Sequence, residues 1–506
     1  MRENAKNQEA INQTFWRACE AYRGKCQPEI YKDWIFNLLF LKYISDVYKI
    51  QHNLLYEKYG AQKDIMVMQI ENMRFSLPKE TDFYFLYESR FQAGNGERID
   101  RALRIVEVAN VDKLHSMFQD VSFNQYQFDD EKEKNDILRH VLELIAEVKF
   151  EKDEQEHTPL IMGRICEYLL EQFSVYYRHA TRELYTPAQV SDLLIDLMQP
   201  QEGDDICDPV CGSGTLLLKC GDYIKHHFNG SKRYALYGQE VESVTWSLAK
   251  MNLFMHHEDN HRIERGDTLR NPKLQDDQGQ LIAFDLILGH PPFSQSQWGY
   301  EQLQNDRFNR FDRGLPPKTK GDYAFILHML KTLKPDSGRM GVVMPRGVLF
   351  RGAYEAQIRQ KLVEENLLDA VIGLPEKILY GTQIAPVILV FKIKKQDSTV
   401  LFVDASQDFI SGKVQNTLDV RHIEKIVQAY HAREHKPQYA EVVTAQTIAN
   451  HDFNLNLSLY VDRYQQEETL ELEVILQQRQ ALQKQLDRID QDITSHLQAL
   501  GYVQGS

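Results

Sequence analysis

Cysteine is scarce in this 506-residue chain, and its six cysteines include no Cys-x-x-Cys pair. Such usage predicts reduced thiols rather than a disulfide framework. A zinc site built from Cys207, Cys211 and Cys220 with His226 and His227 is disfavoured, because the spacing matches no structural zinc pattern. The sequence therefore predicts no metal centre.

Long apolar runs and an excess of basic residues are also missing. The longest apolar run, 34–41, is interrupted by Asn37, and residues 1–9 lack the basic start and apolar core of a secretion signal. We therefore expect a cytoplasmic protein without a membrane span. The net charge is −14, with 59 basic and 73 acidic residues. Since DNA phosphates are neutralised by clustered Lys and Arg, the chain is not expected to hold a long stretch of DNA by itself.

The length and the hydrophobic pattern predict three regions. We expect an N-terminal helical domain at 1–155, a central domain at 156–405 and a C-terminal region at 406–506. The clearest early helix is predicted at 29–48. The tail lacks Pro and Gly from 467 to 500 and carries a heptad seam of Leu482, Leu486, Ile489, Ile493 and Leu500. This helix is predicted to pack either on the chain's own body or against a partner helix.

The central region alternates short apolar runs with helical patterns, which predicts an α/β fold with a doubly wound, mainly parallel sheet. The expected strands are 206–207, 234–237, 284–288, 340–344, 370–374, 387–391 and 401–403. Between the second and the third, Val244, Leu248, Met251 and Met255 recur at helical spacing and predict a helix with one apolar face.

The segment 205–220, DICDPVCGSGTLLLKC, carries the strongest chemical signal. A strand is expected to end at Asp208, and a turn that opens a helix is expected at Gly212, Ser213, Gly214 and Thr215. Glycines let the backbone approach a ligand, and a helix N-terminus offers free N–H groups. The turn is neither GxGxxG nor a P-loop, and Asp208 suits a ligand with a positive amino group. A plain turn between strand and helix is the alternative.

Acidic residues are also expected at the ends of the next strands. Glu240 follows the strand at 234–237, in the position where doubly wound sheets bind ribose hydroxyls. Asp267 is placed similarly and is a candidate contact for the adenine of a cofactor. An ordinary surface carboxylate is the alternative at both positions.

The segment Glu183, Leu184, Tyr185, Thr186 and Pro187 precedes a predicted amphipathic helix. Thr186 is expected as its N-cap, Pro187 as its first residue and Gln189 as the partner in a capping box. Taken alone, the segment indicates a helix start and nothing more.

The segment 285–293, DLILGHPPF, predicts a buried strand that ends in a rigid Pro-Pro turn followed by an aromatic ring. Here the chain resembles the amino methyltransferases that act on DNA, whose motif reads Asn/Asp-Pro-Pro-Phe/Tyr. The resemblance extends to the modification subunit of type I restriction-modification systems. It covers residues 15–48, 183–190, 238–256, 308–325, 338–352, 367–391 and 453–457.

The resemblance implies a Rossmann-like methyltransferase sheet, an N-terminal helical domain and a C-terminal helical tail. It implies S-adenosylmethionine as cofactor, bound by residues 183–187 and 212–215 with Asp208, Glu240 and Asp267, and adenine N6 in double-stranded DNA as the methyl acceptor. The implied partners are a specificity subunit, on which the C-terminal helices dock, and a second copy of the chain in a two-to-one complex. A restriction subunit can join this assembly.

The implied chemistry needs the adenine to be flipped out of the duplex. We expect Phe293 to hold the base, with the Pro291 carbonyl and the His290 side chain accepting its two amino protons beside Pro292. The polar loop at 294–322 is expected either to contact the base and phosphates or to be an ordinary solvated loop. Its candidate contacts are Trp298, Arg307, Phe308, Arg310, Phe311, Arg313, Lys318 and Lys320.

His290 stands where the family motif has Asn. A neutral imidazole has one acceptor nitrogen with a different reach from an amide oxygen, and an imidazolium has none. Losing one such hydrogen bond slows a reaction by roughly 10² to 10³. We therefore expect normal cofactor binding with slow or absent methylation. A silent cofactor-binding scaffold of a DNA-defence complex is the alternative, whereas a nicotinamide oxidoreductase is disfavoured because no GxGxxG follows a strand.

Overall fold

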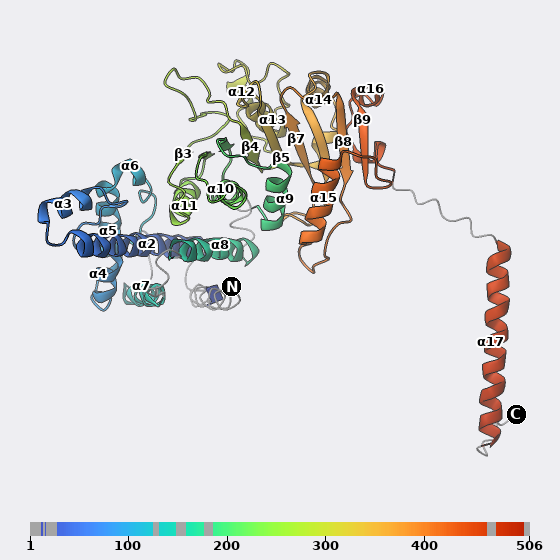
Figure 1. Cartoon of the computed structure of the whole chain (residues 1–506), viewed down its shortest axis with the longest axis horizontal. Helices are drawn as coiled ribbons and strands as arrows, with labels where there is room; N and C mark the ends of the chain where they lie inside the picture. The colour runs from blue at the N-terminus through green and yellow to red at the C-terminus, as the bar shows by residue number, and fades with distance from the viewer. Residues whose placement is uncertain are drawn as a thin grey trace. The chain divides into compact units, whose positions relative to one another are not determined.

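The computed structural model describes residues 12–13, 16, 28–124, 131–147, 158–176, 186–462 and 472–499. Within these residues, nine strands form one mixed sheet (Figure 1). The strands are β1 (Asp205–Asp208), β2 (Ala235–Glu240), β3 (His261–Arg265), β4 (Leu286–Gly289), β5 (Arg339–Pro345), β6 (Leu368–Gly373), β7 (Pro386–Lys392), β8 (Thr399–Asp404) and β9 (Ala440–Thr444). The predicted α/β sheet is thereby confirmed.

The order of the strands in the sheet is β3-β2-β1-β4-β5-β7-β6-β8-β9. Strands β1 to β5 run parallel, as do β6 and β8. Strand β7 is antiparallel to both β5 and β6, and β9 is antiparallel to β8. The carboxyl ends of β1, β2, β3, β4 and β5 therefore meet at one edge, where doubly wound sheets bind their ligands.

Successive residues of the central strands enter two different hydrophobic cores. Ile206 and Leu286 face one core, while their neighbours Cys207 and Ile287 face the other. Because both faces are covered, successive apolar residues of these strands are buried on both sides of the sheet. The first core is shared with α9 (Ala188–Met198), α10 (Thr215–His227), α11 (Ser243–Met255) and α15 (Val420–Ala432). The second includes residues of α13 (Asp322–Lys331), α14 (Tyr354–Glu364) and α16 (Ala445–Ala449), while α12 (Tyr300–Leu303) lies in the chain between β4 and α13.

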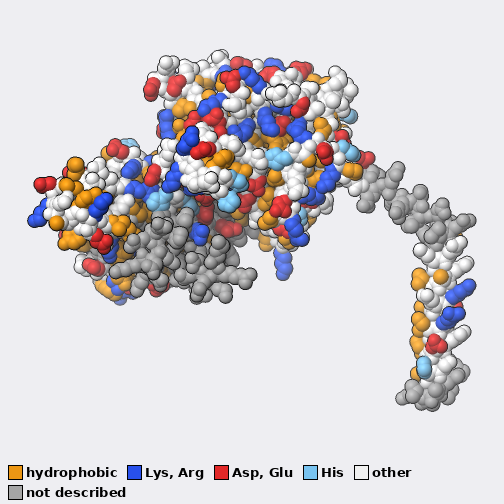
Figure 2. Space-filling view, in the orientation of Figure 1, with side chains coloured by type: hydrophobic (Ala, Val, Ile, Leu, Met, Phe, Trp, Pro, Cys, Tyr) orange, Lys and Arg blue, Asp and Glu red, His pale blue; other side chains and the backbone are white. Residues whose placement is uncertain are grey.

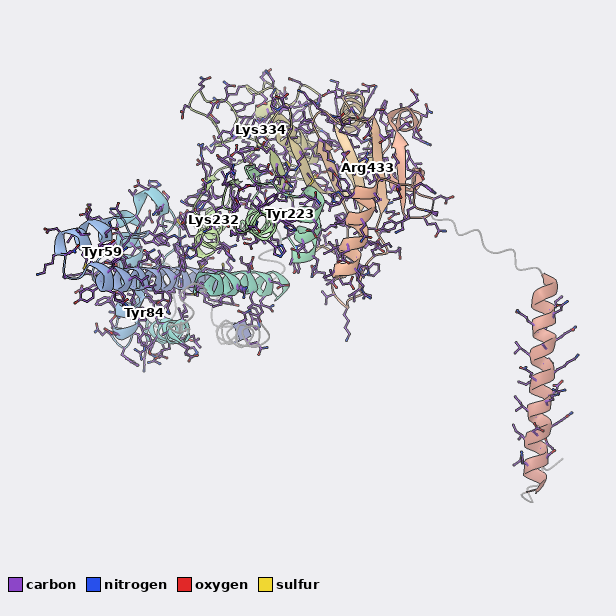
Figure 3. The ribbon with its side chains drawn as sticks, viewed as in Figure 1. Tyr59, Tyr84, Tyr223, Lys232, Lys334 and Arg433 are labelled. Carbon is purple, nitrogen blue, oxygen red and sulfur yellow. The ribbon has the colours of Figure 1, made fainter. Side chains whose placement is uncertain are left out.

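The amino ends of the strands lie at the opposite edge and are joined by an ion-pair network. Lys334, labelled in Figure 3, lies 3.0 Å from the carboxylate of Asp205 and 2.6 Å from that of Asp285. The Asp285 carboxylate also accepts the backbone N–H of Asp205 at 2.9 Å. This network fixes the start of β1 beside the start of β4, so the opposite ends of the same two strands are also neighbours.

The N-terminal part of the described chain is helical, as predicted. Its helices are α2 (Pro28–Tyr59), α3 (Lys63–Glu71), α4 (Phe83–Glu88), α5 (Asn95–Ala109), α6 (Val111–Leu114), α7 (Glu131–Ala146) and α8 (Thr158–Tyr176). Both α2 and α8 contact α11, which in turn packs on the sheet. The predicted boundary at 155/156 lies outside the described residues. Beyond residue 405, β9 still adds a strand to the sheet.

A second unit, Asp462–Ser506, contains the helix α17 (Leu472–Ala499). The predicted seam residues Leu482, Leu486, Ile489 and Ile493 are 50–65% exposed. They form an apolar stripe along this helix (Figure 2), and Leu500 lies outside the described residues. The predicted helix is confirmed. None of the helices that the structure describes has the length and apolarity of a membrane span.

Arg74 joins the N-terminal helices to α11. Its guanidinium donates to the Phe254 carbonyl at 2.8 Å and to the Tyr43 hydroxyl, and pairs with Asp259 at 2.5 Å. The Tyr43 hydroxyl donates to the same Phe254 carbonyl at 2.7 Å. The junction thus rests on hydrogen bonds to a charged group, which contribute more than neutral ones.

We predict that Arg74→Met lowers the stability of the chain by about 2 kcal/mol, because it removes charge-assisted hydrogen bonds to Tyr43, Phe254 and Asp259. The thermal unfolding midpoint measured by calorimetry checks this. Arg421→Met is the matched control, since Arg421 is 89% exposed and binds only a near neighbour in sequence. Equal midpoints for the two variants would contradict the prediction.

Candidate functional site

The turn after β1 brings a buried carboxylate beside a helix N-terminus. Asp208 ends the strand and accepts the backbone N–H of Val210 at 3.0 Å. Gly212 and Gly214 have φ of +52° and +77°, in the left-handed region that favours glycine. Gly214 is the N-cap residue of α10. The predicted strand, turn and helix therefore follow one another as expected, with Asp208 at the base of the turn.

Ser213 and Thr215 of this turn are both buried. Their hydroxyl oxygens are 3.0 Å apart. The side chain of Asn252, on α11, donates to the Ser213 carbonyl at 3.0 Å. This hydrogen bond attaches the turn to α11, the helix that also contacts α2 and α8.

Glu240, at the end of β2, is bonded directly to the turn. Its carboxylate accepts the backbone N–H of Gly212 at 3.1 Å and that of Glu242 at 2.9 Å. Close approach between the two segments requires a glycine at 238, because a Cβ there would lie 2.9 Å from Cys211 Sγ. The structure thus brings Asp208, Glu240 and the glycine turn together, as the sequence predicted.

Both carboxyl groups favour the neutral form more than an exposed acid does. Burial raises the pKa of Asp208 to about 7, and the charge of Glu240 adds to this effect. Burial also raises the pKa of Glu240, although backbone N–H groups partly oppose the shift. A cation bound beside Asp208 would favour its ionised form. The turn is therefore suited to a positively charged ligand.

Asp267 lies after β3 and holds its own turn. Its carboxylate accepts the backbone N–H groups of Leu269 at 2.9 Å and Arg270 at 2.8 Å. The neighbouring Thr268 hydroxyl donates to the Pro209 carbonyl. The loop of Asp267 is thus attached to the turn after β1, which places it at the predicted edge.

The His290–Phe293 turn lies next to the Asp208 turn. A Cβ at Gly289, the last residue of β4, would lie 3.6 Å from Asp208 Oδ1. The rings of His290 and Phe293 are 5.3 Å apart between centroids and inclined by 66°. Burial lowers the pKa of His290 to about 4, so its imidazole is neutral near pH 7.

Thr186 contacts the same turn from the segment before α9. Its hydroxyl oxygen lies 3.0 Å from His290 Nδ1. The predicted capping box is wrong: Pro187 is the N-cap residue in an extended conformation, no side chain caps the helix, and Ala188 is its first residue. The hydroxyl that was expected to cap α9 binds His290 instead. Residues Glu183, Leu184 and Tyr185 lie outside the described residues.

Asp322 supports the His290–Phe293 turn, a role that the sequence analysis missed. Its fully buried carboxylate accepts the backbone N–H of Ser294 at 2.7 Å. It also pairs with Arg351, which binds Glu355 at 2.6 Å. The available signal was an acidic residue at the start of α13, directly after Gly321. The turn is thereby fixed by a buried ion pair on the side of the second core.

Two residues of the loop 294–322 that were candidates for outward contacts, Trp298 and Arg310, pack into the domain instead. Trp298 and Arg310 are each 1% exposed. Arg310 pairs with Asp306 at 2.8 Å and donates to the Leu269 carbonyl at 2.7 Å. Further pairs join Lys318 to Glu301 and Arg313 to Glu365. These contacts neutralise most of the cations that were candidates for phosphate binding.

The cysteines of the region, Cys207, Cys211 and Cys220, are buried, and burial raises the pKa of each thiol. Within the part of the chain that the structure describes, no three His, Cys, Asp or Glu residues are grouped to hold a metal ion.

A sheet of this order defines the fold class of the methyltransferases, with a glycine turn after β1 and a Pro-Pro-aromatic turn after β4 at the shared edge. The family model "N-6 DNA Methylase" matches residues 157–469, and "HsdM N-terminal domain" matches residues 11–145. The chain therefore belongs to the N-6 DNA methylase family, as a type I restriction-modification methylase subunit with an HsdM N-terminal domain. The resemblance inferred from the sequence is confirmed.

Individual relatives agree with this assignment. The chain is 30% identical over 385 residues to the type I restriction enzyme MjaVII methylase subunit of Methanocaldococcus jannaschii, covering 73% of this chain and 64% of that protein, which is just under two thirds. It is 25% identical to the MjaIX methylase subunit of the same organism, covering 96% and 91%. The type I methyltransferase subunit of Streptococcus thermophilus matches in structure with a TM-score of 0.78 at 29% identity, covering 90% and 100%.

The raised pKa of Asp208 predicts that affinity for S-adenosylmethionine, a cation, falls as the pH is lowered. At pH 8 the carboxyl group is mostly ionised, and at pH 6 it is mostly protonated. We expect affinity to fall about tenfold between these values, with proton release on binding near pH 7. Calorimetry in buffers of different ionisation enthalpy measures both quantities. Asp208→Asn is expected to bind weakly without this pH dependence, and the same slope in both proteins would contradict the assignment.

Proposed function

We propose that this chain is a modification subunit that transfers the methyl group of S-adenosylmethionine to adenine N6 in double-stranded DNA. The observation that carries the proposal is the contact between two turns at one sheet edge. The Asp208 turn is suited to a cationic ligand, and the His290–Phe293 turn carries an aromatic ring and polar acceptors. A Cβ at Gly289 would lie only 3.6 Å from Asp208, so ligands of the two turns would be neighbours.

The residues around the Asp208 turn fit this cofactor. The buried carboxylate of Asp208 suits its positive groups, the half-buried carboxylate of Glu240 suits its ribose hydroxyls, and the turn at 212–215 offers backbone N–H groups. We place Asp267 and the segment 183–187 in the same binding site. When bound, S-adenosylmethionine supplies an electrophilic methyl group on a sulfonium. The residues of the chain orient this ligand and exclude water from it.

The part of the site that would bind adenine must act on an amino group that is a poor nucleophile. The nitrogen lone pair of adenine is delocalised into its ring, so acceptors on both N–H groups and correct positioning carry most of the rate enhancement. We assign these acceptors to the Pro291 carbonyl and to His290. Phe293 offers an aromatic face for the flipped base, and Pro292 keeps the turn rigid.

His290 makes the chain a slow methyltransferase in this proposal. Its imidazole is neutral, so one ring nitrogen can accept a hydrogen bond, but the reach of that nitrogen differs from an amide oxygen. The other candidate function, a silent cofactor-binding scaffold, is favoured by the same residue. The two functions differ in whether any methyl group is transferred.

The assembly would need a specificity subunit to bind DNA. The net charge of −14 opposes binding of phosphates, and Arg310, Arg313 and Lys318 of the loop 294–322 are each paired with a carboxylate of the same chain. The apolar stripe of α17 is the surface that we assign to the specificity subunit. Two copies of the chain per specificity subunit complete the assembly, and a restriction subunit can join it.

The test is to co-purify the chain with a specificity subunit from the same organism and to assay methyl transfer to plasmid DNA. We expect slow methylation of adenine by the complex and none by the chain alone. Cofactor binding without transfer, even after the substitution His290→Asn, would replace this proposal by the scaffold function.

In the same assay, His290→Asn is predicted to raise kcat by roughly 10², because the amide oxygen restores an acceptor of the family's geometry. His226→Asn is the matched control, because His226 is exposed on α10, and it is expected to leave kcat unchanged. Equal rates for the His290→Asn complex and the unmodified complex would refute the impairment.

We predict that Leu486→Asp with Ile489→Asp prevents assembly with the specificity subunit, because charges in an apolar helix seam oppose its burial. The control is Gln477→Asp with Gln491→Asp, which adds the same charge on the opposite side of the heptad. Size-exclusion chromatography of the mixed subunits checks this. Cofactor affinity should be unchanged in both variants, and loss of assembly in both would contradict a role for the stripe.

A further inference from the structure

A hydrogen bond links position 290 to a residue outside its own motif. Thr186 Oγ1 lies 3.0 Å from His290 Nδ1, although the two residues are 104 positions apart in the chain. The contact exists because Thr186 does not cap α9. The Thr186 hydroxyl, which the sequence pattern predicts at a helix N-cap, is therefore available to bind the His290 imidazole.

The two nitrogens of a neutral imidazole have opposite roles, since one carries a proton and the other accepts one. Among the described residues, Nδ1 has Thr186 as partner and Nε2 has none. The two nitrogens lie on different sides of the imidazole ring, so the contact between Thr186 and Nδ1 does not occupy Nε2. A proton on Nε2 would oppose an incoming amino N–H, whereas a bare Nε2 would accept it. The location of one proton thus decides whether His290 helps or hinders the reaction.

We infer that Thr186 is a positioning residue, which keeps the His290 proton on Nδ1 and so leaves Nε2 as the acceptor for the substrate amino group. This inference rests on the proposed function. It explains how a chain with histidine in place of asparagine can keep part of the acceptor chemistry. Thr186 itself does not touch the reacting atoms.

The chemistry of the hydroxyl group permits this direction of the hydrogen bond, because a hydroxyl can both donate and accept. A threonine hydroxyl has one proton and two lone pairs, so it accepts from Nδ1–H when its proton is donated elsewhere. Hydrogen bonding to one ring nitrogen generally sets the state of the other, so a Thr186 hydroxyl that accepts from Nδ1–H leaves Nε2 as the acceptor.

The first test observes the tautomer directly and needs neither DNA nor turnover. The chain is labelled with ring-¹⁵N histidine and saturated with S-adenosylhomocysteine, and the His290 signals are identified by their loss in His290→Asn. We expect Nδ1 protonated and Nε2 bare in the unmodified chain and in Thr186→Ser. Thr186→Val, which is similar in shape but has no hydroxyl, should shift the population toward the other tautomer. Protonated Nε2 in the unmodified chain, or an unchanged spectrum in Thr186→Val, would overturn the inference.

The second test is a double-mutant cycle in the assembled complex. Thr186→Val should lower kcat about five- to tenfold more in the unmodified chain than in the His290→Asn chain, because an amide has no tautomer to set. Thr186→Ser should recover most of the rate. Cofactor affinity is measured for each variant, so that a binding defect is separated from this coupling. An equal loss of kcat from Thr186→Val in the unmodified chain and in the His290→Asn chain would show that Thr186 acts independently of His290, and would overturn the inference.

The failures of the two proposals are distinguishable. If no variant methylates DNA, the proposed function fails, while the ring spectra still report the tautomer. If methylation occurs but the spectra do not respond to Thr186→Val, the proposed function stands and the role of Thr186 falls.

Discussion

The site depends on the burial of one carboxyl group, that of Asp208, at the end of β1. Burying a charge without a partner is costly, so the group stays close to neutrality in the free protein, with a pKa of about 7. Its surroundings offer one backbone N–H, from Val210, and a second acid, Glu240, that is itself bound to the turn. A cation beside Asp208 would favour its ionised form, so in the proposed function this turn selects a positively charged cofactor.

The helical N-terminal part reaches this turn through α11. Tyr43 and Arg74 both bind the Phe254 carbonyl near the end of that helix, and Asn252, two residues earlier, donates to Ser213. On the adjoining face, Gly163 of α8 leaves room for His256, because a Cβ there would lie 2.4 Å from the imidazole. The N-terminal helices are therefore connected to the turn after β1 through hydrogen bonds at both ends of one stretch of α11, Asn252 to Phe254.

Short-range sequence patterns predicted most strands of the sheet and the turn after β1, because these features depend on residues that are close together in the chain. Strands such as β4, LILG, and β7, PVILVFK, contain apolar runs, and the glycine turn after Asp208 has its own signature. Strand β3, His261–Arg265, was missed because it has charged residues and lies at the sheet edge, with only Ile263 buried. The roles of Arg310 and Asp322 could not be predicted, since a charged residue in a polar loop looks exposed until its distant partners, Leu269 and Ser294, are known.

Position 290 illustrates why a motif can be identified from sequence while its chemistry cannot. An asparagine side chain carries its acceptor oxygen whatever its neighbours do, so its function follows from the motif alone. A histidine at the same place has an acceptor nitrogen only when its imidazole is neutral. Which of the two nitrogens accepts depends on the tautomer. Burial provides the first condition, and the second depends on a residue that binds the other ring nitrogen. The substitution therefore moves part of the control over the reaction from the Pro-Pro-Phe turn to Thr186, which the sequence had placed at the start of a helix.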